Sequence, residues 1–62
     1  MSNYEIYNRK GIIYENLKMP DEAIKSFDQA IKLAPDYERA FFNKGNVLGS
    51  LSKYNDAIWN LN

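Results

Sequence analysis

The sequence contains neither cysteine nor histidine. The absence of cysteine excludes disulfides, and the absence of both residues removes the thiolates and imidazoles on which most zinc sites and catalytic triads depend. No P-loop or calcium-loop spacing occurs among the other residues. The adjacent carboxylates of Asp21 and Glu22 suit the first turn of a helix, where they favour the dipole. We therefore expect a protein that is not an enzyme, with no catalytic residues, no metal and no cofactor.

An excess of one charge and long apolar runs are also lacking. The chain carries 8 lysines and arginines against 8 aspartates and glutamates, with no block of one sign. It therefore has no basic surface of the kind that nucleic acid or an anionic membrane requires. No apolar run approaches the roughly 18 to 20 residues of a membrane span, and the N-terminus lacks the apolar region of a signal peptide. We expect a soluble, cytoplasmic protein with no nucleic-acid or membrane partner.

The 62 residues allow one small domain, residues 1–62, with a small core. Ser2 and Glu5 have the spacing of a capping box, and apolar residues at helical intervals then predict a helix over about 4–17. Pro20 suits the first turn of a second helix, and Pro35 disfavours its continuation past Ala34. A third helix is predicted over about 38–51, and a short fourth from Asn55. The predicted fold class is all-α, with antiparallel helix-turn-helix units: three full helices and a short fourth.

An internal repeat relates the two halves of the chain. Lys10 and Gly11 recur thirty-four positions later as Lys44 and Gly45, each pair within a predicted helix. The other identical pairs at this spacing are Leu17/Leu51, Ala23/Ala57 and Ile24/Ile58. Two copies of one helix-turn-helix unit explain this pattern, with repeat one at about 4–37 and an incomplete repeat two at about 38–62.

These residues resemble the tetratricopeptide repeat family, whose period is also 34 residues. Its motif of aromatic, glycine, aromatic, alanine, aromatic and proline reads here as Tyr7, Gly11, Tyr14, Ala23, Phe27 and Pro35. The second copy reads Phe41, Gly45, Leu48, Ala57 and Leu61. The chain departs from the family at Lys10 and Lys44, where leucine is usual, and at Lys18, where glycine is frequent. The resemblance implies a solenoid of helix pairs that binds other proteins.

The two repeated glycines predict close helix crossings. A glycine costs roughly 1 kcal/mol of helix propensity relative to alanine, and a close approach between paired helices can offset that cost. We expect Gly11 to face the region of Ala23 on the next helix, and Gly45 to face the region of Ala57. All four residues are predicted to serve helix packing.

The resemblance places a peptide-binding groove on the first helix of each unit. Positions at which the second copy changes the chemistry of the first, such as Phe42 for Asn8 and Asn46 for Ile12, indicate surface free of the shared structural pattern. Arginine can pair with carboxylates, and asparagine can bond an extended backbone. The predicted groove residues are Arg9, Ile12, Arg39, Phe42, Asn43 and Asn46, flanked by Glu5 and Asn8. An ordinary solvated helix face is the alternative interpretation.

Trp59 replaces Lys25 of the first copy and predicts a second kind of contact. Tryptophan buries a large area with few rotatable bonds and is enriched at the centres of interfaces. Helical repeats commonly need about three units to be stable, so Ile58, Trp59 and Leu61 are expected to pack on a second copy in a homo-oligomer. Two partner classes thus remain open, a protein or peptide in the groove and a copy of the chain itself. The sequence is equally compatible with a piece of a longer repeat array.

Overall fold

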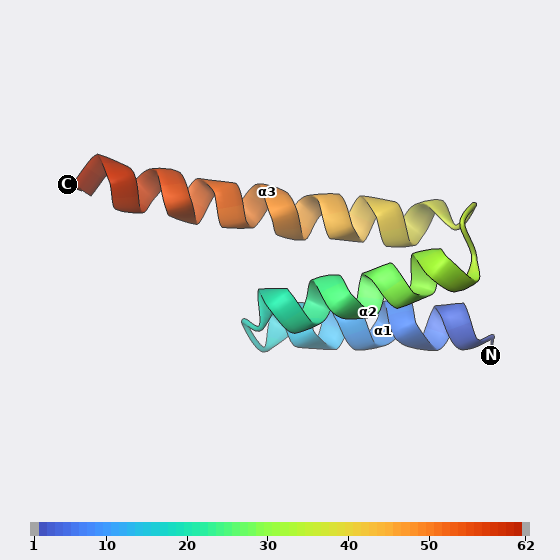
Figure 1. Cartoon of the computed structure of the whole chain (residues 1–62). Coiled ribbons are helices and arrows are strands. Elements are labelled where there is room, and N and C mark those ends of the chain that lie inside the picture. Colours follow the sequence, from blue (N-terminus) through green and yellow to red (C-terminus); the bar gives the residue numbers. More distant parts are fainter. Residues whose placement is uncertain (1, 62) are drawn as a thin grey trace.

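In a computed structural model, the chain forms three α-helices: α1 (Asn3–Asn16), α2 (Pro20–Leu33) and α3 (Glu38–Leu61). The structure describes the backbone of residues 2–61 and the side chains of residues 2–52. Helices α1 and α2 form an antiparallel hairpin, and α3 lies along the other side of α2 and extends past the hairpin (Figure 1). The molecule measures 46 × 21 × 12 Å as a result. The predicted all-α, helix-turn-helix class is confirmed.

Short-range contacts determine both ends of α1. At its start, the Ser2 hydroxyl donates to the Glu5 carboxylate at 2.7 Å and makes no bond to the helix backbone, so the predicted capping box forms only in part. At its end, the Lys18 amide donates to the Glu15 carbonyl and the Met19 amide to the Tyr14 carbonyl. This is the Schellman pattern, with Lys18 in the left-handed conformation at φ 62° where glycine is usual.

Helix α2 carries the core. Pro20 is its first residue, which costs nothing because the first amides of a helix have no partner within it. Ala23, Phe27 and Ala30 recur at helical spacing and are fully buried. Phe27 packs with Ala23 and Val47, and Tyr14, Ile24 and Leu51 complete this cluster. The cluster therefore joins all three helices around one phenylalanine.

Helix α3 docks on α2 through the positions that share one face. Ala40 and Val47 are buried on this face, and Leu51 packs against the core cluster. Between them, the Lys44 ammonium lies 2.6 Å from the Asp28 carboxylate of α2. Lysine at this position, one of the departures from the family, therefore makes an ion pair across the junction between the units. Near the α2–α3 loop, the rings of Tyr4 and Tyr37 meet edge to face at 4.8 Å.

The predicted short fourth helix is not present, because α3 continues through residues 52–54 to Leu61. The first unit turns at Lys18 and Met19 because the ring of Pro20 clashes with a helical Met19 and restricts it to non-helical geometry, and because Pro20 has no amide hydrogen with which to continue α1. In the second unit the position of Pro20 is occupied by Tyr54. The backbone of Tyr54 can donate to the preceding turn, and nothing local stops the helix there.

The two repeated glycines differ in their surroundings. Gly11 is buried, and a Cβ added to it would lie within 2.7 Å of the Phe27 ring, one turn along α2 from the expected Ala23. Nothing lies within 4 Å of a Cβ added to Gly45. The expectation of a close crossing at Gly45 is wrong for this arrangement, because the segment that carries Ala57 continues α3 and does not fold back. The side chain of Ala57 itself lies outside the described residues.

Candidate functional site

A hydrogen bond between two asparagines joins the first helices of the two units. The Asn43 side-chain amide donates to the Asn8 carbonyl oxygen at 3.0 Å, from α3 to α1. Asn8 is only 3% exposed, although it is a polar residue. A buried amide without a partner would cost about 1–3 kcal/mol, so this bond favours one alignment of α1 against α3. Neither asparagine was predicted to have this structural role.

The predicted groove residues surround this bond. Helical spacing of three or four residues places Glu5 and Ile12 on the face of α1 that carries Asn8, and Arg39 and Asn46 on the face of α3 that carries Asn43. Arg9, Arg39 and Asn46 are exposed, Ile12 is 38% exposed and Phe42 is 69% exposed. The structure therefore brings the two predicted rows, thirty-four positions apart in sequence, onto adjacent helices.

The polar capacity of this surface is smaller than the sequence indicates. One amide hydrogen of Asn43 is used by Asn8, which leaves its second amide hydrogen and its carbonyl oxygen for a ligand. Asn8 is buried and cannot contact a peptide directly. Arg9, Arg39 and Asn46 thus supply most of the hydrogen-bonding groups, and Ile12 and Phe42 the apolar contacts.

The carboxylate of Glu5 lies toward the N-terminal end of α1. The hydrogen bond from the Ser2 hydroxyl lowers the pKa of Glu5 below its usual 4.5, and the Ser2 backbone, the N-terminal amino group and Arg9 act in the same direction. Glu5 is therefore ionised at neutral pH and adds one negative charge beside Arg9. A ligand with an acidic group is accordingly favoured closer to Arg39.

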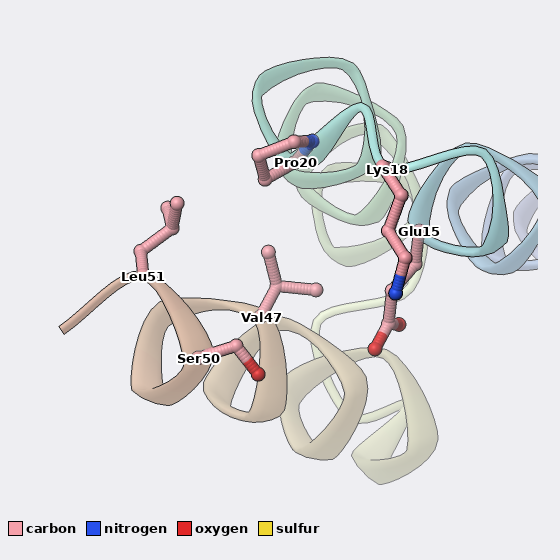
Figure 2. Close-up of a pocket in the computed structure, with 6 residues that line it drawn as sticks. All are labelled: Glu15, Lys18, Pro20, Val47, Ser50 and Leu51. Atoms are coloured by element: carbon pink, nitrogen blue, oxygen red, sulfur yellow. The ribbon is translucent and has the colours of Figure 1, made fainter. Parts of the chain in front are cut away.

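A pocket of about 380 Å³ opens where the C-terminal end of α1 meets α2 and α3. Val47 and Leu51 point from α3 toward Pro20, and Glu15 and Lys18 form the other wall (Figure 2). Ser50 adds a hydroxyl group. This volume is within the range of small-ligand pockets and has room for one large apolar side chain. The sequence prediction missed this site; the lysine at a position where glycine is frequent was its one local signal.

An apolar row lies on the outer face of α1. Ile13 is 57% exposed and Leu17 is 61% exposed, whereas their counterparts in the second unit, Val47 and Leu51, pack on α2. Ile6 is likewise exposed where its counterpart Ala40 is buried. The predicted self-association residues Ile58, Trp59 and Leu61 lie outside the residues whose side chains are described.

Two kinds of site are not found in the described part of the chain. No group of three or more acidic side chains within residues 2–52 is placed to hold a metal ion. Over the same part of the chain, no helix has both the length and the apolar composition needed to cross a membrane.

Comparison with known proteins decides the family. The family model "Tetratricopeptide repeat" matches residues 4–37, more than half of the chain. The chain belongs to the tetratricopeptide repeat family. The resemblance carried by Tyr7, Gly11, Tyr14, Ala23, Phe27 and Pro35 is thereby confirmed, and all six lie within the matched range.

Two relatives of this tetratricopeptide repeat chain are informative. An uncharacterized protein of Methanocaldococcus jannaschii is 38% identical over 53 residues, which are 86% of this chain and 62% of the relative. Human tetratricopeptide repeat protein 6 is 37% identical over 43 residues, 69% of this chain and 8% of the human protein. The chain thus spans less than two thirds of either relative. No solved structure matches it.

Membership of the family bears on function at a coarse level. Tetratricopeptide repeats are generally protein–protein interaction modules and are generally not catalytic. The exposed rows on α1 and α3, the pocket beside them and the outer face of α1 are therefore candidate contact surfaces of a repeat protein.

Proposed function

We propose that the chain is a non-catalytic module that binds a peptide segment along the α1–α3 surface. The observation that supports this most directly is the Asn8–Asn43 hydrogen bond, since it holds the two rows of exposed residues side by side. Arg39 and Arg9 offer charge-assisted bonds to carboxylates. Phe42, 69% exposed, offers a large apolar surface at small entropic cost. A peptide with both acidic and apolar side chains fits this surface best.

The pocket supplies an apolar anchor site for the same peptide. Val47, Leu51 and Pro20 give it an apolar lining, which favours a leucine, isoleucine or phenylalanine side chain. Arg39 and the pocket residue Val47 are eight residues apart on α3, which corresponds to about 12 Å along a helix. An extended peptide covers this distance in about four residues. The preferred ligand therefore carries an acidic residue and a large apolar residue separated by about four positions.

A titration followed by chemical-shift mapping tests the proposal. Peptides with the acid–apolar separation varied from two to six residues are added to the labelled chain. We expect weak binding that is strongest near a separation of four, with shifts concentrated at Arg39, Phe42 and Ser50. Phe42→Ala should weaken binding, and Lys32→Ala, on exposed α2 surface, serves as the matched control. Shifts confined to α2 would refute the site.

Assembly with other repeats is a second candidate function, favoured by the outer face of α1. Ile13 and Leu17 repeat Val47 and Leu51, which already pack on a helix of the α2 type. Lys10 repeats Lys44, which pairs with Asp28. The face therefore suits an amphipathic helix with an acidic residue at the position equivalent to Asp28.

A peptide with the sequence of α2 is a direct probe of this face. Its addition should shift the resonances of Ile13 and Leu17, and a version with Asp28→Lys should bind more weakly because it places two cations together. Ile13→Glu in the chain should abolish the interaction without loss of helix content. Equal binding of both peptides would argue against the α2-like register.

A further inference from the structure

Beside the face of α3 that packs on α2 lies a second face that is apolar and open. Phe41 is 49% exposed, Leu48 is 45% exposed, and nothing lies within 4 Å of a Cβ placed on Gly45. This face differs from the proposed groove, which uses Phe42, Asn43 and Asn46 of the same helix. Its residues are the repeat counterparts of Tyr7, Gly11 and Tyr14.

In the first unit the corresponding face of α1 is covered by α2. The covering contact is close at one point, where the Phe27 ring would lie within 2.7 Å of a Cβ on Gly11. The residues thirty-four positions after Gly11 and Phe27 are Gly45 and Leu61, so the equivalent contact in the second unit would pair these two. The segment of the chain suited to cover Phe41, Gly45 and Leu48 is therefore residues 54–61, which carry Ala57 and Ile58 at the positions of Ala23 and Ile24.

The same chain does not place that segment on this face, because α3 runs straight from Glu38 to Leu61 (Figure 1). A continuous helix separates Gly45 and Leu61 by about 24 Å along its axis. Only the 54–61 segment of another molecule can then reach the open face. We propose that two copies of this chain exchange these segments, with each α3 lying antiparallel along the other.

The register of this exchange is consistent with two-fold symmetry. If Gly45 of one copy opposes Leu61 of the other, the midpoint of the two positions is residue 53, and the reciprocal contact follows from the same axis. Both halves of the pair then reproduce the contact seen once within the α1–α2 hairpin. The interface is isologous and closes as a dimer, as expected when an element is exchanged between identical chains.

Tyr54 is the residue that permits the exchange. Its counterpart Pro20 begins α2 and breaks the helix before it, whereas Tyr54 keeps a backbone amide and lets α3 continue. Tyr54→Pro should restore the break and let residues 54–61 fold back on their own chain. The mass in solution should then fall from twice 7.2 kDa to 7.2 kDa.

Leucine substitutions on α3 distinguish dimer formation from the folding of the single chain. Gly45→Leu meets open space within one chain but should collide with the partner helix, so it should abolish the dimer while helix content is kept. Asn46→Leu is the control on the same helix, since Asn46 is exposed and lies on the groove face, about a quarter turn from Gly45. It should leave the dimer intact. Sedimentation equilibrium at micromolar concentration measures both.

Distances between copies test the antiparallel register. Because the chain has no cysteine, a single spin label can be attached through Ser52→Cys or Glu38→Cys. Labels at position 52 should lie near the axis, roughly 10 Å apart plus the label arms, and labels at position 38 roughly 45 Å apart. Short distances at both sites would show a parallel pair and overturn the proposal. A 7.2 kDa species for the parent chain, or a Tyr54→Pro variant that stays dimeric, would overturn it as well.

Discussion

Lys18 holds a backbone conformation that lysine rarely adopts. Within residues 2–61 it is the non-glycine residue with positive φ, at 62°, and it makes the turn that lets α2 fold back on α1. A side chain costs roughly 1–2 kcal/mol in this region, where glycine has no such penalty. The contacts around Phe27 must offset this strain. Lys18 also lines the pocket, where it supplies a side chain that glycine would lack.

Lys18→Gly is accordingly expected to stabilise the chain. Relief of the positive φ should exceed the extra entropy of glycine in the unfolded state and raise the free energy of unfolding by about 0.5–1 kcal/mol. Lys32→Gly, at an exposed helical site in α2, should lower it by about 1 kcal/mol. Urea unfolding of the two variants measures the contrast. A loss of stability in both would mean that the turn does not strain Lys18.

Gly11 is the residue at which size matters most. Gly11→Leu should destabilise the chain by about 1–3 kcal/mol or more, because the added side chain would overlap the Phe27 ring in a core too small to rearrange. Gly45→Leu should leave the unfolding free energy of a single chain unchanged or higher, since its Cβ meets nothing. Thermal unfolding at a dilution that excludes dimers compares them. An unchanged melting temperature for Gly11→Leu would contradict the observed crossing.

Glu5 predicts a dependence of stability on pH. Its pKa is lowered in the folded chain, chiefly by the Ser2 hydroxyl, so the folded state binds fewer protons than the unfolded state below pH 4.5. The stabilisation is therefore present above this pH and is lost as the pH falls through the folded pKa. Glu5→Gln should remove that part of the acid sensitivity, and Glu38→Gln is the control. Identical pH profiles for the parent and Glu5→Gln would exclude this role.

At the scale of elements, two polar contacts determine how the second unit sits on the first. The Asn8–Asn43 bond joins α1 to α3, and the Lys44–Asp28 ion pair joins α2 to α3. The ion pair is partly exposed and so contributes at most about 1 kcal/mol. The asparagine bond involves a buried group, and its loss leaves an unpaired amide or carbonyl. The asparagines are therefore expected to govern the alignment more strongly.

A double-mutant cycle at this junction gives the strength of the bond. Asn8→Ala and Asn43→Ala should each lower the unfolding free energy by about 1–3 kcal/mol, and the double variant should lose less than their sum by about 1 kcal/mol. Asn46→Ala, exposed on α3, controls for a loss of side-chain volume. Additive losses would show that the two residues act independently.

The helices themselves were largely predictable. The bounds expected for the first two helices agree with α1 and α2 to within a few residues, because Pro20, Pro35 and the helical spacing of apolar residues are local signals. The short fourth helix was predicted from a start signal at Asn55 and Asp56, but α3 continues through these residues, and Tyr54 does not break it as Pro20 breaks the first unit. Whether a helix stops there depends on tertiary contacts as well as on propensity, and repeat symmetry carries no information about them.

At the scale of the whole molecule, the net charge is zero, so an acidic ligand can be attracted only by individual basic side chains near its binding site. Raising the salt concentration from 0.05 to 0.5 M should lower the affinity of the proposed groove for an acidic peptide by less than about tenfold. The reason is that each exposed arginine contributes about 1 kcal/mol or less to binding. The variant with both Arg9→Ala and Arg39→Ala should lose this salt dependence, and a neutral peptide is the control. Fluorescence anisotropy measures both. A steeper dependence would indicate a different, more strongly basic site.

The sequence by itself determined the class of this protein. The period of 34 residues, the small and aromatic positions around Gly11, Ala23 and Phe27, and the two prolines specify paired helices of the tetratricopeptide repeat family. These features are local or repeat-wide, so they can be recognised without coordinates. The absence of cysteine and histidine also excludes disulfides and chemistry that needs a thiolate or an imidazole.

Tertiary structure alone decided which of these residues are buried, paired or open. Gly11 and Gly45 look equivalent in sequence, yet one lies against Phe27 and the other faces open space. Asn8 and Asn43 resemble ligand-binding residues, and the structure joins them to each other. The physical reason is that burial and pairing depend on which helix lies opposite, and the continuous α3 removes from the second unit the helix that its pattern anticipates.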